Sequence, residues 1–151
     1  MPLLGKPTAV TVAFFCNPKR SANDNGTLGF DLYLMKVAAL APFHFADFDG
    51  PDATVTGTLL SVTVTRAGAA PLAISLTPNG WTPHESNFAF GVADVSHVAS
   101  EEKTILQALA AGADSFRIVI TDPRDAKLKL DLTVPVAGKQ AEFQALLKGV
   151  K

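Results

Sequence analysis

The sequence predicts a mainly β protein, an antiparallel β-sandwich or partly open barrel that carries two short helices, one of them C-terminal. Three observations support this prediction. Apolar residues alternate with polar or small residues in several short runs, turn-forming residues separate the runs, and only two segments have helical spacing of apolar side chains. Many short strands separated by turns are typical of sandwiches and barrels, and not of α/β folds.

The first predicted hairpin lies near the N-terminus. Apolar side chains recur at every second position over residues 10–16 and again over residues 28–34, which is the period of a strand with one buried face. The segment that separates these runs, Asn17 to Gly26, consists mostly of residues that favour turns. We therefore expect two long antiparallel strands joined by a polar loop.

The same alternation predicts the remaining strands. A second hairpin is expected around residues 122–125, Asp-Pro-Arg-Asp, because apolar residues alternate on both sides of this turn. Pro78 and Pro83 are expected to interrupt the chain, so residues 78–84 are predicted to form a loop. Further strands are predicted over residues 54–66, 72–76, 88–93, 116–120 and 128–134.

Two segments have the spacing of amphipathic helices. Ser100 is a suitable N-cap for a helix that begins at Glu101, and Gly112 is a suitable stop signal. After Gly138, apolar side chains recur at helical spacing, which predicts a C-terminal helix with one buried face. The apolar positions of this second helix are Phe143, Leu146, Leu147 and Val150.

Length and composition predict one globular domain over residues 1–151. Hydrophobic residues make up 48% of the chain and charged residues 18%, which is far from the composition of a disordered chain. The formal net charge of −1 provides no basic field, so nucleic acid is not expected as a partner. No apolar run approaches the roughly 20 residues that span a bilayer, so no membrane span is expected.

Familiar catalytic motifs are missing from the sequence. It has no phosphate-binding Gly-Lys loop, no dinucleotide-binding glycine triplet, no nucleophile elbow and no paired-histidine zinc helix. Cys16 lies on the apolar face of the first predicted strand, so we expect a buried thiol and not a reactive nucleophile. His44, His84 and His97 lie in different predicted segments, so only the fold can bring them together.

The densest polar cluster is an aspartate-rich turn, in which Asp47, Asp49 and Asp52 surround Gly50. Three carboxylates around a glycine turn can provide oxygen ligands for a hard cation such as calcium. A helix-loop-helix calcium loop that began at Asp47 would need a glutamate at its twelfth position, where Thr58 stands. We expect the alternative, a turn whose aspartates accept hydrogen bonds from their own backbone, with no cofactor.

Candidate binding residues lie mostly in predicted loops. Trp81 and His84 belong to the predicted interrupting loop, where an aromatic side chain either anchors a ligand or packs the loop onto the core. Lys19 and Arg20 lie in the first loop, where they can contact an acidic partner. His44, which precedes the aspartate-rich turn, completes the set.

The segment Phe43 to Ala53 resembles part of a known group of proteins. Its sequence, FHFADFDGPDA, follows a strand with a cysteine and precedes further β-segments and a terminal helix. In this motif and layout the chain resembles small exported bacterial β-domain proteins of uncharacterised function. The resemblance implies a bacterial protein of the periplasm or the secreted fraction. The first seven residues lack the features of a signal peptide, which keeps a cytoplasmic location as the alternative.

Three functions follow as hypotheses. The first is a non-enzymatic binding or interaction module for a protein or small-molecule partner, because the sequence predicts a regular β core and contains no familiar catalytic motif. The second is a small hydrolase or lyase in which His44 or His84 is a base that an aspartate of residues 47–52 orients. The third is a structural subunit of a larger assembly.

Overall fold

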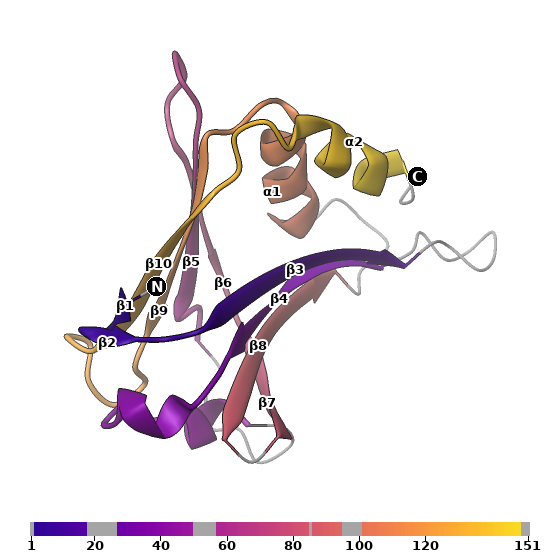
Figure 1. Ribbon diagram of the computed structural model, residues 1–151. Helices are drawn as coiled ribbons and strands as arrows, with labels where there is room; N and C mark the ends of the chain where they lie inside the picture. The colour runs from indigo at the N-terminus through magenta and orange to yellow at the C-terminus, as the bar shows by residue number, and fades with distance from the viewer. Residues whose placement is uncertain (1, 18–26, 50–56, 85, 95–100, 149–151) are drawn as a thin grey trace.

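Two four-stranded antiparallel sheets form the body of the protein in a computed structural model that describes residues 2–17, 27–49, 57–84, 86–94 and 101–148 (Figure 1). The sheets do not close into a barrel, and two helices accompany them, so the predicted fold class is confirmed. Sheet I contains, in spatial order, β3 (Val10–Asn17), β4 (Thr27–Leu34), β8 (Asn87–Asp94) and β7 (Asn79–His84). Sheet II contains, in spatial order, β10 (Lys129–Pro135), β9 (Ser115–Thr121), β5 (Leu60–Thr65) and β6 (Leu72–Leu76).

Both predicted hairpins are confirmed. β3 and β4 pair along their whole length, from Val10 opposite Leu34 to Asn17 opposite Thr27. β9 and β10 pair in the same way around the turn at residues 122–128. In each hairpin the alternation of apolar side chains sets the register, because a slip by one residue would move the whole apolar set to the outer face.

One predicted loop is wrong, because residues 79–84 form the edge strand β7. A proline is tolerated here because Pro83 lies in an edge strand, and the register with β8 shifts between Trp81 and His84. Gly80 is needed for close packing: an added Cβ would lie 2.7 Å from the carbonyl oxygen of Phe48 and 2.7 Å from the ring of Phe88. Pairing of this strand with β8 and the close packing at Gly80 therefore outweighed its turn-forming composition.

Both predicted helices are present, as α1 (Glu101–Ala110) and α2 (Gln140–Lys148). They lie in the wedge where the two sheets diverge, which Figure 1 shows at the top. α2 buries Phe143, as its apolar spacing predicted, while Ser100 and Val150 lie outside the described residues. The residues of α1 that enter the core are Ile105, Leu106, Leu109 and Ala110.

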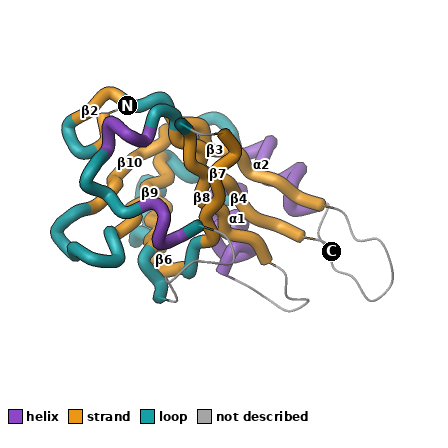
Figure 2. The backbone as a smooth tube through the Cα atoms, turned by 90° about the horizontal axis from the view of Figure 1, so that it is seen from below, coloured by secondary structure: helices purple, strands orange, loops and turns teal. Residues whose placement is uncertain are grey.

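The opposite end of the molecule is covered by two short 3₁₀ helices that the alternation did not predict. These are η1 (Val37–Leu40) and η2 (Phe45–Phe48), and Figure 2 views the molecule from their end. Leu40, Phe43 and Phe48 anchor this segment in the core. The segment also contains His44 and Asp47, so its packing decides where two of the candidate residues lie.

The inner faces of both sheets form one hydrophobic core. Its centre is an aromatic cluster in which the ring of Phe116 lies 5.3 Å from those of Phe14 and Phe30, and Phe14 contacts Phe143 edge-on at 5.0 Å. This cluster joins both sheets to α2. The side chain of Cys16 lies outside the described residues, so its burial stays a prediction. No helix in the described part of the chain is long and apolar enough to span a bilayer.

Candidate functional site

His44 lies between η1 and η2, on a segment that crosses the end of the sandwich. The peptide bond between Ala41 and Pro42 is cis, and the buried ring of Phe43 fixes the chain immediately before His44. The imidazole itself is half-buried, with 35% of its side chain exposed. The local sequence therefore presents a histidine at the surface while its apolar neighbours fill the core.

Asp122 is the partner of His44. It follows β9, and its side chain is fully buried. Its carboxylate accepts a hydrogen bond from the His44 backbone N–H at 2.7 Å, and both carboxylate oxygens lie 3.0 Å from Nδ1 of the His44 ring. It also accepts the backbone N–H groups of Arg124 at 2.8 Å and Asp125 at 3.0 Å. A buried carboxylate with this many donors is held in a single orientation.

The donors around Asp122 also set its charge. Burial alone would raise the pKa of Asp122, but the backbone N–H groups of His44 and Arg124, together with the imidazole, lower the pKa below its ordinary value. Asp122 is therefore ionised at neutral pH and can only accept hydrogen bonds. Nδ1 of His44 must then donate, and in the neutral form of the ring the other nitrogen, Nε2, is the acceptor.

A second contact ties the same two segments together. The Asp47 carboxylate accepts two hydrogen bonds from Arg124, from Nε at 2.7 Å and from Nη2 at 2.8 Å. The hydrogen bonds from Arg124 lower the pKa of Asp47, although partial burial acts in the opposite direction. The segment is therefore held to the β9–β10 turn at two points, at His44 immediately before η2 and at Asp47 within it.

These residues border a hollow of about 460 Å³, which we call the histidine hollow. Most of its lining residues are apolar, and the polar residues that line it are His44, Asp47, Ser86 and Arg124. The apolar lining consists of Val37, Ala38, Ala41, Phe43, Phe45 and Ala46. An apolar concavity with a few fixed polar groups is the usual form of a small-ligand site.

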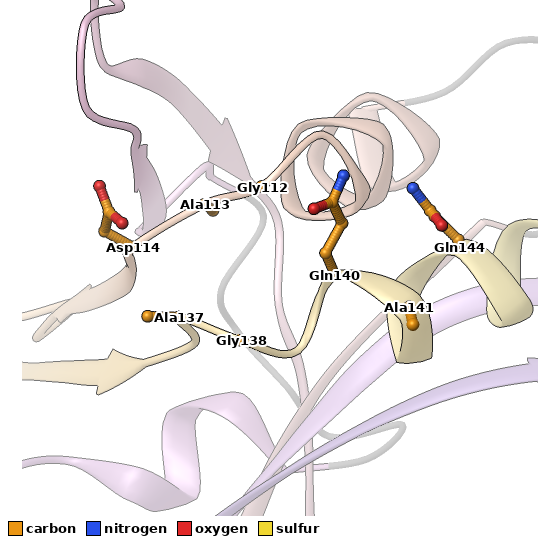
Figure 3. A pocket seen from close by; sticks show the side chains of 8 residues that line it. All are labelled: Gly112, Ala113, Asp114, Ala137, Gly138, Gln140, Ala141 and Gln144. Atoms are coloured by element: carbon orange, nitrogen blue, oxygen red, sulfur yellow. The ribbon is translucent and has the colours of Figure 1, made fainter.

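A second hollow, of about 590 Å³, lies between the turn after α1 and the start of α2 (Figure 3). Its polar side chains already have structural roles: Asp114 accepts the backbone N–H of Ala67 at 2.8 Å, and Gln144 donates to the carbonyl of Ala110 at 3.2 Å. Figure 3 shows Gln140 directed toward the turn at Gly112. This hollow contains no histidine, so it offers less chemistry than the histidine hollow.

The other predicted site residues are scattered. Trp81 lies on β7 and contacts Tyr33 edge-on, with ring centroids 6.3 Å apart, on the outer face of sheet I. His84 lies at the exposed end of β7 and does not line the histidine hollow. Lys19 and Arg20 lie outside the described residues, as does His97. The structure thus joins His44 and Asp47 but places Trp81 on another surface.

The aspartate-rich turn is divided in the same way. Asp47 is paired with Arg124, while Asp49 accepts a hydrogen bond from the Thr82 hydroxyl at 3.3 Å. Asp52 lies outside the described residues. Within the described ranges, no three histidine, cysteine, aspartate or glutamate side chains converge in a way that could hold a metal ion. Among those residues Asp47 is neutralised by an arginine, which makes it a poor ligand for calcium.

Sequence reasoning missed Asp122 and Arg124 as site residues. It treated residues 122–125 only as a hairpin turn, and Asp122 does act as a turn residue by accepting the N–H groups two and three positions ahead. The sequence pattern contains no sign that the same carboxylate also receives His44, which is distant along the chain. The hypothesis paired His44 or His84 with an aspartate of residues 47–52, whereas in the structure His44 pairs with Asp122.

Comparison of the chain with protein-family models, with curated proteins and with solved structures finds no match, so the site is interpreted from its own geometry.

Proposed function

We propose that the protein is a binding module whose histidine hollow takes a ligand with an apolar body and one hydrogen-bond donor, such as a hydroxyl or amide N–H. One observation carries the proposal: buried Asp122 holds His44 so that Nε2 is a fixed acceptor beside an apolar hollow. A fixed acceptor loses little conformational freedom on binding, so it contributes more to affinity than a mobile one.

The charges around the hollow favour a neutral donor over an anion. Arg124 is occupied by both oxygens of Asp47, and His44 rests on an anionic carboxylate. The hollow therefore has no free positive charge among its described lining residues. The apolar lining supplies most of the binding free energy, and the donor to Nε2 fixes the orientation of the ligand.

Phenol is a suitable probe, because it joins an apolar ring to one hydroxyl donor. Titration of the protein with phenol, followed by backbone amide NMR shifts, should give saturable shifts around Phe43, Phe45 and Ser86. Toluene, which lacks the hydroxyl, should bind more weakly. His44→Phe keeps a ring of similar size but removes the acceptor, so it should reduce phenol affinity to that of toluene.

His84→Phe is the matched control, since His84 is an exposed histidine outside the hollow. It should leave the titration unchanged. Equal binding of phenol and toluene to the native protein would contradict the proposal, and so would a phenol affinity that survives His44→Phe. Circular dichroism of both variants verifies that the fold is retained.

A second candidate function is general-base catalysis, as in a small hydrolase or lyase. The observation that favours it is the oriented His44–Asp122 pair, because a carboxylate that accepts from Nδ1 leaves Nε2 ready to take a proton. Among the described residues the His44 ring hydrogen-bonds to no serine, threonine or cysteine, so the base would activate water. Hydrolysis of p-nitrophenyl acetate tests this candidate. Turnover that disappears in His44→Gln, but not in His84→Gln, would support it over simple binding.

The same proposal places the module in the bacterial periplasm, on the basis of the resemblance of residues 43–53 to exported proteins. Release of the native protein by osmotic shock tests that location. Retention in the cytoplasmic fraction would remove this part of the proposal without affecting the binding site.

A further inference from the structure

The outer face of sheet I carries the only tyrosine and the only tryptophan of the chain, and they lie side by side. Tyr33 on β4 and Trp81 on β7 both occupy the row of Ala89, which is completely covered. Their rings are nearly perpendicular, at 88°. In Figure 1 α1 and α2 lie in the wedge between the sheets and η1 and η2 lie at the opposite end, so none of these described helices covers this outer face. Two aromatic side chains are thus gathered on the side of the sheet away from the core.

A carboxylate stands beside these rings. Asp31 lies in the next row of the sheet, opposite Gly91, and its Oδ2 accepts a hydrogen bond from the Tyr33 hydroxyl at 3.1 Å. A Cβ added at Gly91 would lie 2.8 Å from Oδ1 of Asp31 and 2.9 Å from Cζ3 of Trp81. The second carboxylate oxygen and the indole therefore converge above Gly91, less than about 6 Å apart. Only a residue without a side chain leaves them room to do so.

No lysine or arginine of the sheet's strands balances this carboxylate. The four strands of sheet I contain no lysine and no arginine. No lysine or arginine in the described ranges forms an ion pair with Asp31. An anion that is half-buried among aromatic rings, and that has no lysine or arginine partner among the described residues, attracts a positively charged group.

We propose that this face docks an arginine side chain of a partner protein, with Asp31 as the counter-ion and Trp81 as the stacking surface. A guanidinium is planar, so it can lie against an indole face while its in-plane N–H groups reach a carboxylate oxygen at the ring edge. A lysine ammonium is compact and strongly hydrated, so it does not serve both groups equally well. The proposal is independent of the histidine hollow, which lies at the end of the sandwich.

The rest of the face fits a protein partner. Half-buried Ala13 and Phe15 continue the surface along β3, where Ala13 lies opposite Asp31 and Phe15 opposite Gly29 of β4. A surface that is rich in aromatic side chains and poor in lysine and glutamate shares these two features with the core of a protein–protein interface. An arginine of the partner would be the anchor of such an interface.

Trp81 is the chain's own reporter, because it is the only tryptophan. The full chain is titrated with an acetylated, amidated peptide of three Gly-Arg repeats, and with the matching lysine and glutamine peptides. We expect a saturable change in Trp81 fluorescence with the arginine peptide, a weaker response with the lysine peptide and none with the glutamine peptide. Asp31→Asn should weaken arginine binding by about tenfold or more, because it removes a charged hydrogen-bond partner.

Asp131→Asn is the matched control, since Asp131 is the outward aspartate of sheet II. It should leave the titration unchanged. Equal affinity for the arginine and glutamine peptides would overturn the proposal, as would arginine binding that survives Asp31→Asn. A saturable response to cellobiose with none to arginine would assign the face to carbohydrate instead. If Asp31→Asn does not fold, the affinity of the native protein for the arginine peptide is measured at increasing sodium chloride concentrations. An affinity that does not change with added salt would contradict a charge-based site.

Discussion

The outer faces of the two sheets differ, although their inner faces are built alike. Sheet II presents threonines and serines to solvent, with an exposed pair in which Arg117 donates to Asp131 at 2.9 Å. Sheet I presents Phe15, Tyr33 and Trp81 among alanines and glycines, and its strands contain no lysine or arginine to pair with Asp31. One face is an ordinary solvated surface, and the other has the composition of a contact surface.

The difference indicates which exposed sheet face has a role besides contact with water. Threonine favours the extended strand conformation, and the hydroxyls of threonine and serine hydrogen-bond to water. Such residues are sufficient for a face that contacts only water. Aromatic rings on an outer face leave apolar surface in water, and Trp81 and Tyr33 reduce that cost only by covering Ala89 and Gly91. The arrangement on sheet I is explained by a partner, and variants on the two faces test that explanation.

The largest effect is expected from removing the indole. Trp81→Ala should lower the free energy of unfolding by about 2 kcal/mol, which is less than the ~3–5 kcal/mol of a fully buried aromatic because Trp81 is half-buried. Val119→Ala, on the outer face of sheet II, should cost less than about 1 kcal/mol. Urea unfolding followed by circular dichroism measures both. Equal losses at the two positions would mean that the faces do not differ in packing.

A smaller change in the free energy of unfolding is expected from Gly91→Ala, and its sign should be opposite to that of most glycine-to-alanine substitutions in strands. Replacing a strand glycine by alanine ordinarily stabilises a protein by about 0.4–1 kcal/mol. Gly91→Ala should instead destabilise by about 1 kcal/mol and change Trp81 fluorescence, because the new Cβ displaces Asp31 and Trp81. Ser75→Ala, at an exposed outer position of β6, is the control and should be neutral. Stabilisation by Gly91→Ala would show that the cluster above this glycine is loose.

The third effect is a titration. Burial, and then the hydrogen bond and charge of Asp31, raise the pKa of Tyr33 above its ordinary value of 10.0. Asp31→Asn should lower the pKa of Tyr33, but not fully to 10.0, since burial remains. Tyrosinate absorbance follows this directly because the chain has one tyrosine. An unchanged pKa would show that the phenol and the carboxylate are not in contact.

The smallest effect is expected on sheet II. Hydrogen bonds from Arg117 lower the pKa of Asp131, so the pair contributes stability above the unfolded-state pKa of about 3.9, and the contribution is lost as pH falls through the folded-state pKa. Arg117→Gln should raise the pKa of Asp131, as carboxyl NMR shifts would show, and should lower the melting temperature at neutral pH only slightly, because an exposed ion pair contributes at most about 1 kcal/mol. A clear drop in melting temperature would mean that the ion pair on the outer face of sheet II contributes substantially to the stability of the fold.

Regular alternation made most of the fold predictable. The hairpins of β3 with β4 and of β9 with β10 follow from a two-residue period with turn residues between the runs, and α2 follows from helical spacing after Gly138. β7 was not predictable, because Asn79, Gly80 and Pro83 favour a turn locally, and only packing against β8 and Phe48 makes the segment a strand. The site was predictable in part: His44 was identified, but its partner was not.

The sequence alone determined the mainly β class, the two helices and the inward faces of the predicted strands, because these depend on short-range periodicity and on the burial of apolar area. Tertiary structure alone decided that Asp122 orients His44, that Arg124 neutralises Asp47 and that the only tyrosine meets the only tryptophan beside Asp31. Apart from the Tyr33–Asp31 hydrogen bond, which lies within β4, each of these contacts joins residues from different elements. Their distances follow from strand order and from how the chain crosses the ends of the sandwich, and a local sequence pattern contains no record of either.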